Sequence, residues 1–207
     1  LDALFAGYIL IFERFRLTTL DTGSWAHWAV AFLGLDFFYY WFHRASHEVN
    51  FLWAAHIVHH QSEEYNLSVA LRQSAVQQFL GAPFYWPLAF LGVPPMMFLA
   101  LDAFDTLYQF WIHTRTIGRL GFLDAVLNTP SNHRVHHGSN AKYIDRNHGG
   151  VLIVWDRLFG TFEPEVEEPI YGLTTPLDSW NPVWANVHVW ADLARDAWLA
   201  PRWADKL

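Results

Sequence analysis

The sequence predicts an all-helical fold in which apolar helices form membrane hairpins beneath a polar, histidine-rich cap. Charged residues make up 16% of the 207 residues, against about 25% in an ordinary soluble domain, and aromatic residues make up 18%. Two apolar stretches are long enough to supply helices that cross a bilayer core of about 30 Å. Eight of the twelve histidines fall into three five-residue clusters.

The apolar stretches divide the chain into predicted helices. Residues 4–12 form a run too short to cross a bilayer alone, whereas residues 25–42 are long enough at about 1.5 Å per residue. Residues 76–112 are interrupted at Pro94 and Pro95, which cannot both lie inside a regular helix. We therefore expect two spanning arms, residues 76–93 and 96–112, joined by a tight turn. Two crossings return the chain to the side it left, so all three clusters can share one membrane face.

The flanking charges predict that this face is cytoplasmic. Arg14 and Arg16 lie on the opposite side in this scheme, but most basic residues lie on the cluster side, and positive residues favour the cytoplasm. Twelve tryptophans, many at the ends of apolar runs, are typical of an aromatic belt at a membrane interface. The basic residues on the cluster side are Arg44, Arg72, Arg115, Arg119, Arg134, Lys142, Arg146 and Arg157.

The last third of the chain is polar and loop-rich, with a short apolar run at residues 151–155 and an acidic stretch at residues 163–168. Asn181 and Pro182 predict the N-cap and first position of a helix. Its apolar side favours a helix lying on the membrane surface, with docking on the protein core as the alternative. We expect residues 1–207 to form one domain of an N-terminally truncated chain, because Leu1 is neither an initiator methionine nor the start of a signal peptide.

The histidine clusters have the spacing of metal ligands. In a helix, residues three and four apart lie on one face, so each cluster presents two or three imidazoles together. Imidazole is the commonest metal-binding side chain near neutral pH. Eight nitrogen donors exceed the needs of one tetrahedral ion, so two metal ions are predicted. The clusters HRASH, HIVHH and HRVHH supply His43, His47, His56, His59, His60, His133, His136 and His137.

Composition limits the kind of site without selecting the metal. The chain has no cysteine, which excludes cysteine-rich zinc sites, iron–sulfur clusters and disulfides. Imidazole suits zinc, copper, iron and nickel, so ligand type alone does not choose among them. The net charge of −7 argues against nucleic acid as a partner.

Other polar residues are further candidates for the site. His113 ends the second hairpin arm at the depth where the clusters converge, so we expect it to be a ninth ligand. Asp36 lies about two turns before His43 inside an apolar run, where it can hold a histidine in one tautomer, and pairing with another donor is the alternative. His148 lies alone in a polar Asn-His-Gly-Gly loop, so we do not predict it as a ligand.

These motifs resemble those of the fatty acid hydroxylase and sterol desaturase superfamily of integral-membrane non-haem di-iron enzymes. The order HxxxH, HxxHH, HxxHH, with a hydrophobic hairpin between the second and third motifs, is specific to that superfamily. Within it, the chain is most similar to enzymes that oxidise O-alkylglycerols, over about residues 8–182, and the tail after Asn181 departs from them. The matching segments are DFFYYWFHRASHEVN, EYNLSVALRQS, LYQFWIHT, LNTPSNHRVHHGSN and GGVLIVWDRLFGTFEPE.

The resemblance implies an oxygen-dependent lipid monooxygenase with two iron ions and tetrahydrobiopterin as the electron donor. Such an enzyme hydroxylates the carbon next to the ether oxygen, and the product separates into a fatty aldehyde and glycerol. Glu48, directly after the first cluster, is a candidate pterin contact, with a surface or ligand-orienting role as the alternative. Besides the ligands, Asp36 and Glu48 are thus the candidate catalytic residues.

Two other functions stay open at the level of sequence. A sterol or fatty-acyl hydroxylase or desaturase would use a redox partner protein in place of the pterin. A membrane metal-storage or transport protein would need polar residues along its spans, but the histidines lie at the span ends, with Asp36 and Asp102 among the few charges inside. The expected partners are a lipid, molecular oxygen and the membrane, and the sequence allows a homo-oligomer.

Overall fold

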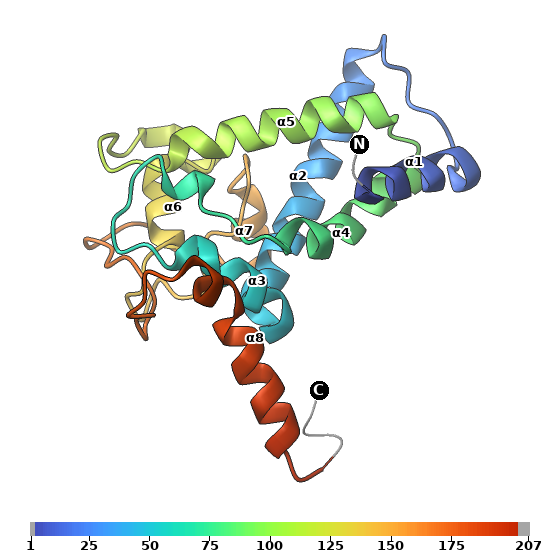
Figure 1. Ribbon diagram of the computed structural model, residues 1–207. Helices are drawn as coiled ribbons and strands as arrows, with labels where there is room; N and C mark the ends of the chain where they lie inside the picture. Colours follow the sequence, from blue (N-terminus) through green and yellow to red (C-terminus); the bar gives the residue numbers. More distant parts are fainter. Residues whose placement is uncertain (1–2, 203–207) are drawn as a thin grey trace.

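The computed structural model describes residues 3–202, which form helices joined by loops (Figure 1). Within these residues there is no β-strand, only an isolated bridge between Leu127 and Leu152. The predicted all-helical class is therefore confirmed for the described part of the chain. The elements are α1 Ala3–Phe15, α2 Trp25–Glu48, α3 Asn50–His60, the 3₁₀ helix η1 Val69–Leu71, α4 Gln77–Leu91, α5 Pro95–Ile112, the 3₁₀ helix η2 Gly121–Ala125, α6 Pro130–His136, α7 Val154–Phe159 and α8 Pro182–Leu199.

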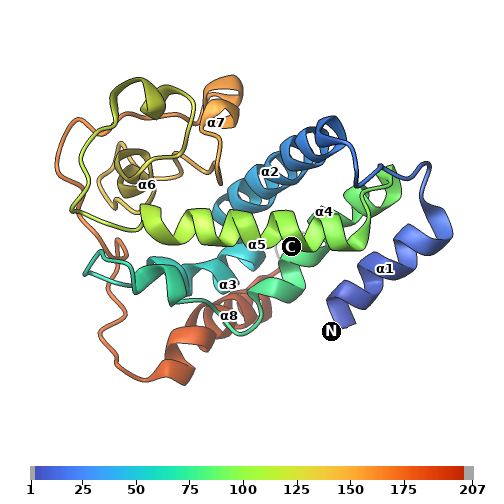
Figure 2. The same ribbon diagram turned by 90° about the horizontal axis from the view of Figure 1, so that it is seen from above.

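Helix α2 is the central element of the fold. It packs against α3, α4 and α5, while α1 lies against α4 (Figure 2). An apolar core forms where α1, α2, α4 and α5 meet, and its buried side chains include Tyr8, Leu35, Leu88 and Met97. The Tyr8 hydroxyl donates a hydrogen bond of 2.9 Å to the Val93 carbonyl, which ties α1 to the α4–α5 turn. This core fixes the relative positions of α2 and α5, the two helices that lead into histidines.

Two helices joined by a short turn lie where the sequence predicts the hairpin arms, and the two helices diverge. Helix α4 ends at Leu91 and α5 begins at Pro95, so the break falls at the prolines as expected. Gly92 in the turn has a left-handed φ of +97°, and a Cβ there would lie 2.2 Å from the Thr18 carbonyl oxygen. Arm α4 packs on α1 and α2, arm α5 packs mainly on α2, and the two arms contact each other little (Figure 1). Across residues 3–202, none of the helices is both long enough and apolar enough to cross a membrane.

Helix α8 begins where the sequence predicts it. The Asn181 side chain accepts hydrogen bonds from the amides of Val183 and Trp184 at 2.9 and 3.2 Å, which is the N-cap geometry. Its first turns dock on α3, where Gln61 donates a hydrogen bond to the Ala185 carbonyl. The remainder of α8 projects away from the other helices (Figure 1). The docking alternative therefore holds for the first part of this helix.

Candidate metal centre

Helices α2 and α3 bring the first two histidine clusters together. His43 and His47 lie one turn apart near the C-terminal end of α2, with ring centroids 5.4 Å apart. A short break at Val49 turns the chain into α3, and this places His56 4.8 Å from His43, ring to ring. His60, one turn after His56, lies 4.8 Å from His47. The shared faces expected from helical spacing are therefore present.

The other ligand candidates come from α5 and α6. His113 is the residue that caps the C-terminal end of α5, as the sequence predicts. Helix α6 begins with Pro130 at its first position and carries His133 and His136, with His137 as its C-cap residue. The His133 ring lies 4.3 Å from that of His113. The third cluster thus meets the end of the second hairpin arm.

The nine imidazoles named from the sequence converge into two groups, each able to hold one metal ion. In each group the candidate ligand atoms lie within 4.8 Å of one another, and almost all of the side chains are buried. The two groups are adjacent, since the rings of His60 and His137 stack at 4.4 Å across their boundary. The first group is His43, His47, His56, His60 and His136, and the second is His59, His113, His133 and His137.

Hydrogen bonds to main-chain carbonyls set the orientation of several of these rings. A carbonyl oxygen only accepts, so the Nδ1 atom that faces it must carry the proton. His43, His113 and His136 donate in this way to the carbonyls of His148, Gln109 and Arg146, at 2.8, 2.6 and 2.9 Å. In this tautomer the Nε2 lone pair is free and points into the group, which is the arrangement of a metal-bound histidine.

A bound metal ion explains the short distances between facing Nε2 atoms better than a hydrogen bond between the two rings does. The Nε2 atoms of His43 and His56 are 3.1 Å apart, and those of His59 and His113 are 3.2 Å apart. With Nδ1 protonated, such a pair presents two lone pairs and no proton to share. Ligands of one ion at about 2.1 Å lie about 3.0–3.4 Å from each other, so a cation between them accounts for the spacing. The Nε2 atoms of His47, His136 and His137 are buried without a hydrogen-bond partner.

Burial keeps these imidazoles neutral. Removal from water, followed by the proximity of other histidines, lowers the pKa of His43, His47, His60, His133, His136 and His137 well below the usual value. The same desolvation lowers the pKa of His56 and His113 to about 3 and that of His59 to about 4. Neutral imidazole is the form that binds metal, so the site is prepared for ligation at neutral pH.

His148 is a tenth imidazole at the edge of the first group, and the sequence did not point to it. Its ring lies 5.1 Å from that of His47, and both of its ring nitrogens are buried without a hydrogen bond. Its main-chain carbonyl accepts the hydrogen bond that His43 Nδ1 donates. A single histidine in a polar loop has no periodicity to reveal it, and the two following glycines, Gly149 and Gly150, were the available signal of close packing.

Asp36 does not hold a histidine directly, which corrects the role expected for it. Its carboxylate accepts hydrogen bonds from the amides of Val151 and Leu152 at 2.7 and 3.2 Å and from the Trp155 indole at 2.8 Å. The buried Asp156 accepts from two more amides of the same loop, those of His148 and Gly149. Two aspartates from distant helices therefore clamp the loop whose carbonyl orients His43.

Gly150 shows how tightly this loop fits between α2 and α5. A Cβ at Gly150 would lie 2.8 Å from the Tyr39 ring and 2.9 and 3.1 Å from carboxylate oxygens of Asp105 and Asp36. Any side chain there would push the loop away from both helices. The glycine is therefore required by the close approach of three elements.

Glu48 lies on the surface. Its carboxylate accepts a 2.8 Å hydrogen bond from Arg44 one turn earlier, and both side chains are partly exposed. This is the surface role that the sequence left as the alternative. The cofactor contact expected at Glu48 stays a prediction.

Arg134, inside the third cluster, joins three segments beside the site. It makes a two-pronged pair with Glu165, with both N–O distances 2.7 Å, and donates to the carbonyls of Thr114 and Ile117 at 3.0 and 2.7 Å. Although burial acts in the opposite direction, hydrogen bonds from Arg134 and Ser131 lower the pKa of Glu165. This buried pair fixes α6 against the end of α5, and sequence patterning gave no sign of it.

A cavity of about 450 Å³, which we call cavity A, leads from the apolar helices to the imidazoles. Its outer walls come from α1, α4 and α5 and include Tyr8, Trp86 and Phe98. At its inner end it reaches imidazoles of both groups, which are His56, His59 and His113. Glutamines and aspartates line it between the two ends, and they are Gln73, Gln77, Gln78, Asp102, Asp105 and Gln109.

Comparison with known proteins assigns the chain to a family. The sequence pattern that defines the fatty acid hydroxylase family matches residues 28–161, which include all nine imidazoles. The chain belongs to this family. No solved structure matches it.

Individual relatives are similar over most of the chain. It is 50% identical to an alkylglycerol monooxygenase of Xenopus tropicalis over 202 residues, which are 98% of this chain and 45% of the relative. It is 51% identical to the human alkylglycerol monooxygenase over 199 residues, 96% of this chain and 44% of the relative. An ornithine lipid hydroxylase of Rhizobium tropici is 32% identical over 149 residues, 65% of this chain and 43% of the relative. The chain thus spans less than half the length of these relatives.

Proposed function

We propose that this chain is the catalytic part of an iron-dependent lipid monooxygenase that acts on O-alkylglycerols. The observation that carries the proposal is the pair of buried imidazole groups with inward-facing Nε2 atoms. All nine histidines serve as ligands, five to one iron and four to the other. Bound iron supplies the oxygen chemistry that breaks an unactivated C–H bond, which lies beyond ordinary side-chain acids and bases.

The chain's own residues hold and shield this chemistry. Main-chain carbonyls keep the Nδ1 atoms of His43, His113 and His136 protonated, so their Nε2 atoms stay available as ligands. Burial keeps the rings neutral, which is the form that binds metal. The clamp formed by Asp36 and Asp156 fixes the loop behind His43. These residues position ligands and do not touch the substrate.

Cavity A receives the lipid. Its outer wall of aromatic and aliphatic side chains suits the alkyl chain, and its glutamines can bind the two glycerol hydroxyls near His56 and His59. This places the carbon next to the ether oxygen beside the imidazoles. The reaction consumes one O₂, two electrons and two protons, leaves one oxygen atom on that carbon and releases the other as water. As the ether C–O bond of the resulting hemiacetal breaks, the proton of the new hydroxyl passes to the glycerol oxygen, giving an aldehyde and glycerol.

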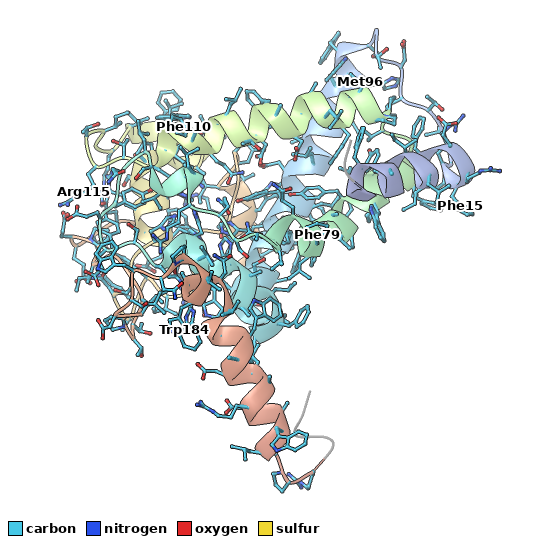
Figure 3. All side chains as sticks on the ribbon, viewed as in Figure 1. Phe15, Phe79, Met96, Phe110, Arg115 and Trp184 are labelled. Carbon is cyan, nitrogen blue, oxygen red and sulfur yellow. The ribbon has the colours of Figure 1, made fainter. Side chains whose placement is uncertain are left out.

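Helices α1, α4 and α5 suit a membrane location with the metal groups on the cytoplasmic side. Large apolar side chains lie exposed along α1, α4 and α5, among them Phe15, Phe79, Met96 and Phe110 (Figure 3). Exposed apolar surface of this extent marks contact with lipid or with another protein. We propose that it contacts lipid, because cavity A opens among these helices.

The test is product analysis with the iron-loaded protein. Incubated with O₂, reduced tetrahydrobiopterin and an O-alkylglycerol, it should release fatty aldehyde and glycerol in equal amounts, and ¹⁸O from O₂ should appear in the aldehyde when exchange with water is suppressed. An intact ether, together with a hydroxylated sterol or fatty acid when a partner reductase is supplied, would assign the other enzyme class instead.

A further inference from the structure

A second cavity reaches the imidazoles from a different direction. This cavity B has a volume of about 610 Å³ and is lined by α3, α8 and loops around residues 138–145 and 172–177. It contacts His47, His60, His136 and His137, whereas cavity A contacts His56, His59 and His113. No residue lines both cavities, and each reaches both imidazole groups. Two different molecules can therefore approach the metal groups at the same time.

We infer that cavity B binds the small electron donor, a reduced pteridine. The inference rests on the proposed function, because hydroxylation needs two electrons and two protons that the lipid does not supply. A tetrahydropteridine provides both as it becomes a dihydropteridine. Cavity A is occupied by the lipid in this scheme, so the donor needs its own route to the groups.

The walls of cavity B have the chemistry that a pteridine requires. Trp53 offers an aromatic face, and its ring lies 5.1 Å from His47 and 5.6 Å from His60. Asp145 offers a carboxylate to the amino and N–H edge of the pteridine, a match for two parallel hydrogen bonds. Thr174 and Thr175 add hydroxyls from the loop of residues 172–177. A volume of this size is ordinary for a small-molecule site.

The loop geometry explains why Asp145 faces the cavity. Asp145 and Asn147 both have left-handed backbone angles, φ 55° and 57°, which aspartate and asparagine tolerate better than most residues. The turn directs one Asp145 oxygen toward His47 Nδ1, at 3.3 Å, and the Arg146 carbonyl toward His136. Glu48, the carboxylate named from the sequence, lines neither cavity.

The test of the inference is a binding measurement with the iron-loaded protein and oxidised biopterin, a redox-inert probe. Fluorescence quenching reports the binding. Thr174→Trp fills cavity B and Asp145→Asn removes its charge, and each should weaken binding by about tenfold or more. The matched variant Ala82→Trp, which fills cavity A, should bind within about twofold of wild type. Iron content of every variant is measured in parallel, so that loss of the metal groups is not read as loss of the pteridine site.

The opposite pattern overturns the inference. If Ala82→Trp loses the probe and both cavity B variants keep it, the donor binds in cavity A. If the wild-type protein does not bind the probe, the inference also fails. A single turnover of dithionite-reduced protein with O-alkylglycerol separates these failures from failure of the proposed function, because aldehyde release from the wild-type protein there needs no pteridine and should be lost in Ala82→Trp.

Discussion

The second imidazole group has only four members, so each histidine in it carries a large share of the binding of one ion. Replacing His59 by alanine removes a nitrogen that lies 3.2 Å from its neighbour on His113 and leaves three donors. We expect iron to fall from two ions to about one per chain and aldehyde release to be lost. Metal analysis of the purified variant checks this. His27, whose ring accepts a hydrogen bond from the Asp21 amide outside both groups, is the control, and His27→Ala should keep both ions.

Asp36 and Glu48 have the same charge and different surroundings, which makes them a matched pair. Asp36→Asn replaces an acceptor oxygen by an amide that cannot accept from the loop N–H groups, so we expect a loss of about 1–3 kcal/mol in the free energy of unfolding. Glu48→Gln breaks only a partly exposed pair and should cost less than about 1 kcal/mol. Denaturant unfolding followed by circular dichroism measures both. Equal losses in the two variants would contradict the clamp.

At the scale of elements, α6 depends on one buried ion pair for its position. Arg134→Met leaves Glu165 buried without its partner, and we expect a loss of about 3–5 kcal/mol. Arg115→Met removes an arginine that pairs with Glu168 on the surface, where both side chains are more than half exposed, and should change stability by less than about 1 kcal/mol. The comparison is made by thermal unfolding of the two variants at the same protein concentration. A similar midpoint for both would show that the Arg134 pair contributes little.

The sequence predicted elements wherever the signal was local. Apolar runs and prolines located α2, α4 and α5, and Asn181-Pro182 located the start of α8, because helix length and capping depend on neighbouring residues. Helical spacing within each cluster, together with the position of His113, predicted all nine imidazoles that converge in the structure. The divergence of α4 and α5, which opens cavity A between them, depends on how both pack against α2 and is absent from any local pattern.

Long-range contacts explain what the sequence could not predict in the site. Asp36 meets its partners Val151 and Leu152 more than a hundred residues later, so its spacing from His43 suggested the wrong partner. His148 enters the site from a loop held by Asp156. The division of the imidazoles into five and four mixes members of different clusters, and it depends on which rings of α3 and α6 meet in the folded chain.

For the whole molecule, the buried imidazoles predict how stability depends on pH when metal is removed. The pKa of His56 and His113 is about 3, and that of His59 about 4, against about 6.5 in an unfolded chain. Below pH 6.5 the unfolded state therefore binds protons that the folded state does not. Stability is fully present above that pH and falls, as pH drops toward 4, by about 1.4 kcal/mol per unit for each such histidine.

Chelator-treated protein provides the measurement. Its unfolding midpoint should fall between pH 7 and pH 5, and His56→Gln should reduce the slope by about one proton. A midpoint that does not change over this range would show that the imidazoles are not held neutral in the folded metal-free chain.

The division of ligands also dictates when metal can be acquired during synthesis. His136 belongs to the first group and His133 and His137 to the second, so the first set is complete only at residue 136 and the second only at residue 137. By then α2, α3, α4 and α5 have already emerged. A complete set of ligands therefore forms only in a chain whose helical framework exists, and a nascent chain stalled before residue 130 should retain neither ion at full affinity.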